Sequence, residues 1–70
     1  MTDEMRAQLS DMRELRYCMR GCRAFFIRHG IDWDRVRREG VALGELRETG
    51  DAMALRLVEH VEAKADGRQQ

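Results

Sequence analysis

Apolar residues in the last third of the chain recur with the spacing of one helical face. The stripe consists of Ala54, Leu57, Val58, Val61 and Ala65. Arg56, Glu59 and Glu62 lie off the stripe, so one side of the segment is suited to a core and the other to solvent. The pattern predicts an amphipathic helix over residues 52–64.

A second apolar stripe runs through the first half of the chain and predicts helices over residues 11–19 and 22–29. Its members are Met12, Leu15, Met19, Cys22, Phe25 and Phe26. Ser10 or Asp11 is the expected N-terminal cap of the first helix. Gly21 either separates the two helices or lies inside one continuous helix, where glycine costs about 1 kcal/mol relative to alanine. The pattern leaves both possibilities open.

Three glycines stand at ten-residue intervals, and each follows a stretch that ends in charged or polar residues. They are Gly30, Gly40 and Gly50. Such glycines are typical of helix C-terminal caps, because the cap needs a left-handed backbone that glycine adopts without strain. Asp32 and Asp51 follow two of these glycines and are suitable N-terminal caps for the next helices. Short helices are therefore predicted over residues 33–39 and 43–48.

Length and composition agree with one small helical domain. The chain has 70 residues, of which 43% are hydrophobic and 37% charged, and it contains no proline. Proline breaks helices, and a chain of this size supports only one modest core. The expected fold is all-α, a single small domain of four to five short helices with glycine C-caps. Residues 1–10 are expected to form a partly ordered N-terminal segment, 11–65 the helical domain and 66–70 a disordered tail.

The formal net charge of zero conceals a segregation of charge along the chain. Residues 13–38 carry a net charge of +5, whereas the acidic segments before and after them carry −2 and −3. Arginines at three- and four-residue steps predict a basic ridge on a helix, which suits phosphates or an acidic protein surface. The candidate partner-binding residues are Arg13, Arg16, Arg20, Arg23, Arg35 and Arg38. The alternative is a solvated face whose arginines pair with the acidic helix predicted over residues 52–64, of the same or a neighbouring molecule.

The sequence offers little support for a metal site or for catalysis. Only Cys18, Cys22, His29 and His60 could bind a soft metal, and their spacing differs from that of structural zinc sites. The simpler interpretation of the cysteines is two small buried thiols on one helix face. The sequence contains no glycine-rich phosphate loop and no serine-centred nucleophile motif. No catalytic, cofactor-binding or metal-binding residues are therefore predicted, and the protein is not expected to be an enzyme.

Self-association is a further expectation, because chains this short often gain stability from a second copy. The helix predicted over residues 52–64 carries more apolar surface than one side of a small core easily covers. The candidate dimer face consists of Leu55, Leu57, Val58 and Val61. A homodimer through this face is therefore expected alongside binding to another protein.

Several strings of the chain resemble a family of small proteins of tailed bacteriophages and prophages. The strings HGIDW and TGDAMA are the most distinctive of them. The matching stretches are Tyr17–Cys18, Gly21–Phe26, Arg28–Trp33, Glu39–Val41 and Thr49–Ala54, within about residues 11–62. The resemblance implies a phage-encoded accessory protein connected with virion assembly, and it brings no functional residues with it.

The expected function is therefore binding to a phage or host protein during head or tail morphogenesis, without catalysis. A nucleic-acid-binding regulator is an alternative that would use the arginines, although the acidic helix predicted over residues 52–64 opposes phosphate contact. A phage-encoded inhibitor of a host protein is a second alternative. No apolar run approaches the roughly 18 residues of a membrane span, so no membrane partner and a cytoplasmic or virion-associated location in the host cell are expected.

Overall fold

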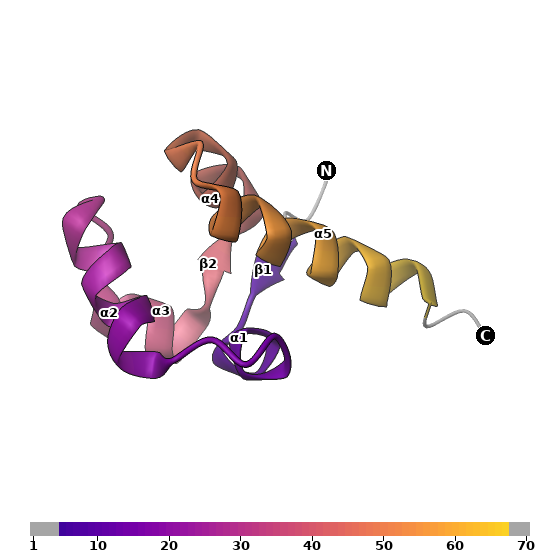
Figure 1. The fold of residues 1–70 in the computed structure, drawn as a ribbon, viewed down its shortest axis with the longest axis horizontal. Coiled ribbons are helices and arrows are strands. Elements are labelled where there is room, and N and C mark those ends of the chain that lie inside the picture. The colour runs from indigo at the N-terminus through magenta and orange to yellow at the C-terminus, as the bar shows by residue number, and fades with distance from the viewer. Residues whose placement is uncertain (1–4, 68–70) are drawn as a thin grey trace.

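Five helices and two very short strands form the fold in a computed structural model, which describes residues 5–67 (Figure 1). In chain order they are β1 (Arg6–Ala7), α1 (Leu9–Glu14), α2 (Met19–Arg28), α3 (Trp33–Glu39), β2 (Val41–Ala42), α4 (Leu43–Thr49) and α5 (Ala52–Gly67). The domain is 73% helical, which confirms the prediction of four to five short helices. Residues 1–4 and 68–70 of the two predicted terminal segments lie outside the described residues.

The two strands join the N-terminal segment to the middle of the chain. β1 and β2 pair in antiparallel orientation, with Arg6 opposite Ala42 and Ala7 opposite Val41. The strands lie at the centre of the molecule, with α2 and α3 on one side and α5 on the other (Figure 1). Ala7 is fully buried, so the folded domain begins before residue 11, where the sequence pattern predicts its start. Strands of two residues are too short to show the alternating pattern that would predict them.

Helix α1 ends earlier than the apolar stripe predicts, because the chain turns at Arg16. The backbone N–H of Tyr17 donates to the carbonyl of Met12 at 3.0 Å, and that of Arg16 donates to the carbonyl of Arg13 at 2.8 Å. These two bonds form a Schellman cap in which Arg16 takes the left-handed conformation, with φ of 63°. The predicted helix over residues 11–19 is therefore wrong: its second half is a turn and the start of α2.

Helix α1 also begins earlier than predicted. Its N-cap is Gln8, and Asp11 occupies the third helical position. The Asp11 carboxylate accepts the backbone N–H of Gln8 at 2.7 Å, as in a capping box. Neither Ser10 nor Asp11 is the cap residue, so that part of the prediction is wrong. The cap was missed because glutamine is an unusual residue at this position.

Gly21 lies inside helix α2, which decides between the two possibilities left open by the sequence. The helix begins at Met19, with Cys18 as its N-cap in an extended conformation. A Cβ atom added at Gly21 would meet the Cys18 Cβ at 4.0 Å, an ordinary van der Waals contact. Gly21 therefore destabilises α2 only through the low helix propensity of glycine, and it does not separate two helices.

The three glycines predicted at helix C-termini have positive φ, and Asp32 and Asp51 are the predicted N-terminal caps of the helices that follow them. The φ angles are 73° for Gly30, 80° for Gly40 and 68° for Gly50. The Asp32 carboxylate accepts the backbone N–H of Asp34 at 3.1 Å, and the Asp51 carboxylate accepts that of Met53 at 2.9 Å. Because caps fix helix ends, α3 covers the predicted residues and α4 ends one residue beyond its predicted end.

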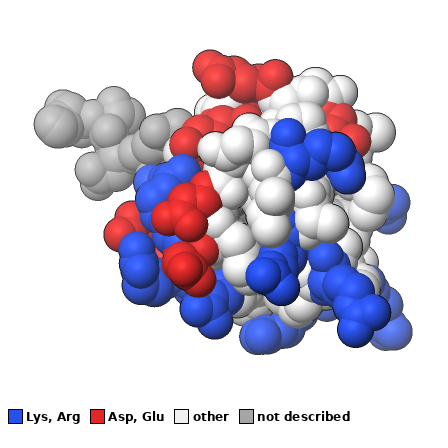
Figure 2. Space-filling view, turned by 90° about the vertical axis from the view of Figure 1, so that its left-hand side faces the viewer, with Lys and Arg blue, Asp and Glu red and all other residues white. Residues whose placement is uncertain are grey.

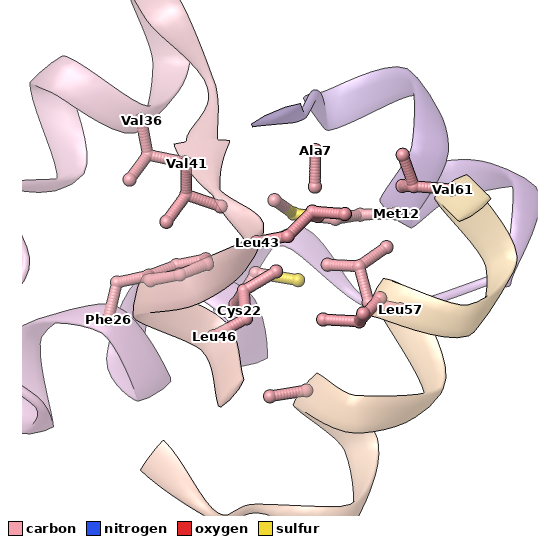
Figure 3. Packing of buried hydrophobic residues seen from close by; sticks show 12 residues of the cluster. Ala7, Met12, Cys22, Phe26, Val36, Val41, Leu43, Leu46, Leu57 and Val61 are labelled. Atoms are coloured by element: carbon pink, nitrogen blue, oxygen red, sulfur yellow. The ribbon is translucent and has the colours of Figure 1, made fainter. Parts of the chain in front are cut away.

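The hydrophobic core lies between the helices and the short sheet (Figure 3). Each of the five helices contributes at least one buried apolar residue. The largest fully buried side chains are Phe26, Met12, Leu46, Val36 and Val41. Helices of six to ten residues are marginal alone, so this shared core is what stabilises them.

Three of the four residues in the predicted dimer face belong to this core. Leu57 and Val58 are each 3% exposed, and Val61 is 8% exposed. Leu55 is the exception, at 40%. One chain therefore covers Leu57, Val58 and Val61 by itself, which removes the reason for expecting a dimer through these three residues.

Candidate protein-binding site

An apolar groove lies between helix α2 and the beginning of α5. It encloses about 240 Å³, and its lining includes Tyr17, Cys18, Phe25, Arg28 and Met53. This volume is below the roughly 300–1,000 Å³ of sites for small molecules. The groove is therefore better suited to apolar side chains of a partner protein than to a substrate or cofactor.

Contacts between residues that are distant in the sequence fix the walls of the groove. The Tyr17 hydroxyl donates to the backbone carbonyl of Met53 at 3.0 Å, across a separation of 36 residues. Asp51 caps α5 beside this contact. On the α2 side, the Arg28 guanidinium carbon lies 5.9 Å from the centroid of the Phe25 ring, within the range of a cation–π interaction. Burial raises the pKa of Tyr17, so its hydroxyl remains a donor.

The two cysteines occupy different environments, and Cys18 contradicts the prediction of two buried thiols. Cys18 is exposed at the groove, whereas Cys22 is buried. Backbone N–H groups of Gly21 and Arg20 lower the pKa of the Cys18 thiol, and burial raises the pKa of Cys22. No histidine stands among the described residues that line the groove. Among these lining residues, the Cys18 thiol therefore has no histidine to act as the base that activates a cysteine nucleophile.

Basic side chains gather on the side of the molecule that carries α2 and α3. Figure 2 shows lysine and arginine along the lower and right-hand parts of this side, acidic residues toward the top, and a mixture of both at the left. Helix α2 contributes Arg20, Arg23 and Arg28, all exposed, and it contains no acidic residue. Positive charge is thus concentrated on the helix that also forms one wall of the groove.

The candidate arginines do not form one helical ridge, because the chain turns at Arg16 between α1 and α2. Their three- and four-residue steps span two helices and so do not place the side chains on one face. Arg35 is engaged within the chain by Glu45 at 3.0 Å. Glu62 of α5 pairs with Arg47, so pairing of the candidate arginines with α5 of the same chain is not seen among residues 5–67. In that range, the candidates without an ion pair are Arg13, Arg16, Arg20, Arg23 and Arg38.

Several residues at the groove could not be predicted as site residues from the sequence pattern. Met53 is 57% exposed although it is large and apolar, and it lies off the buried stripe of α5. Arg28 lines the groove, and Arg56 is close enough to Tyr17 for its charge to act on the Tyr17 hydroxyl. The only sequence signal for these residues is their position beside the apolar stripes, which many surface residues share.

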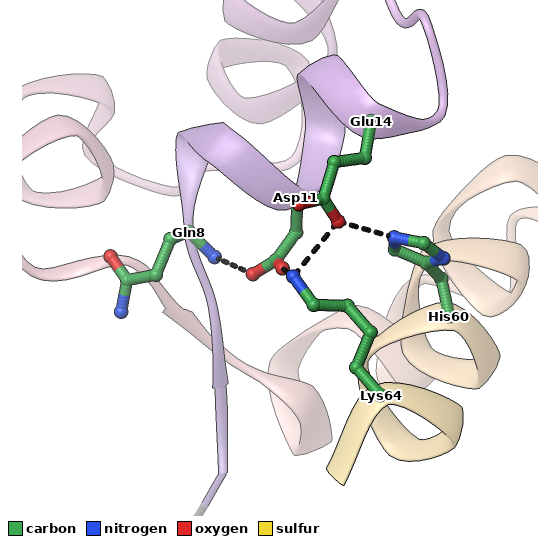
Figure 4. Close-up of polar contacts among 5 residues, drawn as sticks. All are labelled: Gln8, Asp11, Glu14, His60 and Lys64. Atoms are coloured by element: carbon green, nitrogen blue, oxygen red, sulfur yellow. Dashed lines mark hydrogen bonds and ion pairs between the residues drawn. The ribbon is translucent and has the colours of Figure 1, made fainter. Parts of the chain in front are cut away.

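A cluster of charged residues joins α1 to the second half of α5 (Figure 4). The Lys64 ammonium lies 2.5 Å from a carboxylate oxygen of Asp11 and 2.8 Å from one of Glu14. Nε2 of His60 lies 2.8 Å from the same Glu14 oxygen. The Asp11 side chain is only 8% exposed, so this end of the cluster is shielded from water. The cluster therefore holds α5 against α1.

Three of these residues form the one group of potential metal ligands found among residues 5–67. The ligand atoms of Asp11, Glu14 and His60 lie within 4.8 Å of one another. The Lys64 ammonium supplies positive charge between the two carboxylates. The cysteines considered as soft ligands from the sequence are not part of this group. The arrangement is that of a structural clamp between two helices.

The clamp predicts a pH-dependent contribution to stability. Hydrogen bonds from Lys64 and His60 lower the pKa of Glu14 below its usual 4.5. Because the unfolded chain then binds more protons, the contribution of Glu14 is present above about pH 4.5 and is lost as pH falls through its folded pKa. Asp11 and Glu14 raise the pKa of Lys64 above 10.5. The contribution of Lys64 is therefore present below about pH 10.5 and is lost as pH rises through its folded pKa.

We expect Lys64→Met to remove much of the loss of stability at acid pH and much of the loss at alkaline pH. The melting temperatures of wild type and variant should differ most between about pH 5 and pH 10 and converge at the acid and alkaline extremes. Circular dichroism melts across this range measure the difference. Arg38→Met, at an exposed arginine of α3 without an ion pair among the described residues, is the control and should give a constant difference. Parallel pH profiles for wild type and Lys64→Met would contradict the expectation.

No family model, curated protein or solved structure matches this chain. Among the helices of residues 5–67, none combines the length and the apolar character needed to span a bilayer. A functional assignment therefore depends on the chemistry of the groove and of the arginines on α2.

Proposed function

We propose that this protein is a non-catalytic accessory protein of phage or prophage origin that binds another protein through the surface around α2. The phage origin is supported by the resemblance of the strings HGIDW and TGDAMA, and this resemblance also favours a role in head or tail morphogenesis. The observation that carries the proposal is that α2 exposes three arginines without an ion pair among the described residues, and that one of them, Arg28, lines an apolar groove.

The distribution of ion pairs supports a partner with an acidic surface. The arginines that pair within the chain lie outside α2, in the pairs Arg35–Glu45, Arg37–Asp34 and Arg47–Glu62. In the part of the chain that the structure describes, the arginines of α2 have no such partner. Exposed guanidinium groups bind carboxylates with two parallel hydrogen bonds. Complementary charges also accelerate association with an acidic partner.

The chemistry of the groove favours binding without catalysis. Asp51 is used as a helix cap, and the Tyr17 hydroxyl donates to a backbone carbonyl. Cys18 has a lowered pKa but no histidine beside it among the described lining residues. A nucleophile, a base and an orienting group together would favour a hydrolase or transferase. The groove offers a nucleophile, the Cys18 thiol, but no histidine base among its described lining residues, so we assign it no catalytic role.

A nucleic-acid-binding regulator is the second candidate, because the same arginines could contact phosphates. It is less well supported, since nucleic-acid-binding domains usually have a clear excess of positive charge and this chain has a formal net charge of zero. An inhibitor of a host protein would use the same surface as the favoured proposal. It differs only in the identity of the partner.

Reversing the charges of α2 should abolish partner binding. We expect the immobilised wild-type protein to retain a discrete protein from a lysate of bacteria that produce tailed phages. The double variant Arg20→Glu, Arg23→Glu should reduce this retention at least about tenfold. Both side chains are exposed, so the variant should keep its helical circular dichroism spectrum. The double variant Arg37→Glu, Arg47→Glu makes the same change of charge at two exposed arginines outside α2 and should retain most of the partner.

A DNA mobility shift separates the two candidates. Binding of duplex DNA that weakens steeply between about 50 and 200 mM salt, without a retained protein, would favour the regulator and contradict the proposal. Equal retention of the partner by both double variants would show that α2 is not the binding surface. Loss of the partner with the α2 variant alone supports the proposal.

A further inference from the structure

We propose that the groove between α2 and α5 takes an acidic amphipathic helix of the partner protein. Its apolar side chains would enter the groove, and its carboxylates would pair with Arg28 and Arg56. This inference rests on the proposed function and specifies the class of partner. Helices with apolar residues at every third or fourth position are common ligands of hydrophobic grooves.

The apolar half of the inference depends on Met53. Met53 lines the groove and is 57% exposed, so a large apolar side chain is available for contact with a ligand. Methionine adapts its shape to apolar ligands, which makes it common in surfaces that bind helices. Phe25 and Tyr17 are only partly buried on the other walls of the groove. An apolar side chain inserted between them would remove apolar surface of all three residues from water, which favours binding.

The charges beside the groove select an acidic ligand. Arg28 lines the groove, and Arg56 follows the lining residue Met53 by three positions on α5, a spacing that places both side chains on the same face of the helix. Neither arginine forms an ion pair among the described residues. Asp51 is the one acidic residue in the described lining, and its carboxylate accepts two backbone N–H groups of α5. Its negative charge is thus offset by the positive end of the helix dipole. The groove therefore presents net positive charge to a ligand.

A second copy of this chain does not offer a suitable helix among its described residues. Helix α5 is acidic and amphipathic, but Leu57, Val58 and Val61 are buried in its own core. Helix α2 carries arginines and no acidic residue. Insertion of α5 into the groove of another copy would require unfolding of the core that it came from. The occupant is therefore a helix of a different protein.

The test is a selection of random peptides of about 16 residues, long enough for four helical turns, on the immobilised full-length protein. We expect the enriched peptides to be acidic, with apolar residues at helical spacing. Their affinity should fall about tenfold for Met53→Gln, which removes apolar contact. It should fall about threefold or more for Arg28→Gln, with a weaker dependence on salt.

Ile27→Gln is a closely matched control. Ile27 is 58% exposed, compared with 57% for Met53, and it is absent from the described lining of the groove. Both substitutions replace an exposed apolar side chain of a helix with the same polar one. The affinity of the selected peptides for Ile27→Gln should remain within about twofold of that for the wild type, because surface substitutions away from a site have small effects.

Several results would overturn the groove inference. They are a failure to enrich peptides, enrichment of basic peptides, and equal binding of the selected peptides by wild type and Met53→Gln. A wild-type dimer that Met53→Gln abolishes would also overturn it, since a second copy would then be the occupant.

The lysate experiment separates the groove inference from the proposed function. A partner that is retained by Met53→Gln but lost by the α2 double variant contradicts the groove inference and leaves the proposed function intact. Absence of any partner for the wild type contradicts the proposed function itself.

Discussion

Replacing Gly40 with alanine is expected to destabilise the fold by roughly 3–5 kcal/mol. Gly40 has φ of 80° and ψ of −174°, a backbone conformation that residues with a Cβ atom essentially do not adopt. An added Cβ atom would also lie 2.6 Å from the backbone carbonyl oxygen of Ala7. This oxygen has little freedom to move, because Ala7 is fully buried and pairs with Val41 in the sheet. Backbone strain and steric overlap therefore act together at this position.

Gly30 and Gly50 are the controls for this substitution. Both have positive φ, but a Cβ atom added at either position would meet nothing within 4 Å. Alanine at either site should therefore cost only about 1 kcal/mol, from backbone strain alone. Urea unfolding followed by circular dichroism measures the three losses. Similar losses at Gly40 and at the two control positions would show that the close approach of β1 does not constrain the fold.

The helices that could be predicted well are those whose ends carry a residue with a local preference. Helix α3 starts after Asp32 and ends at Gly40, and both residues favour a cap by their own chemistry. The end of α1 could not be predicted, because Arg16 occupies a left-handed position where glycine is usual. The sheet could not be predicted either, since the pairing of Ala7 with Val41 depends on the folded core and not on a local pattern.

The candidate site was partly predictable for a similar reason. Segregation of charge along the chain indicates a basic middle segment, and the structure exposes two of its arginines, Arg20 and Arg23, on α2. The pattern gives no sign that Arg35 pairs with Glu45. The groove itself depends on a hydrogen bond between Tyr17 and the backbone of a residue 36 positions away. Contacts of this kind are fixed by packing and leave no periodic signal in the sequence.

Phe26→Ala is expected to destabilise the protein by about 3–5 kcal/mol. Phe26 is 2% exposed and is one of the largest buried side chains of the domain. Its ring packs edge to face on Phe25, with centroids 5.3 Å apart, and stacks on Trp33 at 6.0 Å. Because Trp33 begins α3, this second contact joins α2 to α3. Alanine would leave a cavity at this junction and remove packing on which two short helices depend.

Ile27→Ala is the control, since Ile27 is the next residue on the same helix and is 58% exposed. It should change stability by no more than about 0.5 kcal/mol. Phe26→Leu should fall between the two alanine variants, because leucine keeps apolar volume but loses the aromatic contacts. Urea unfolding of the three variants therefore separates loss of volume from loss of ring contacts. Nearly equal stabilities of Phe26→Leu and Phe26→Ala would mean that the aromatic contacts with Phe25 and Trp33, and not the filled volume, join α2 to α3.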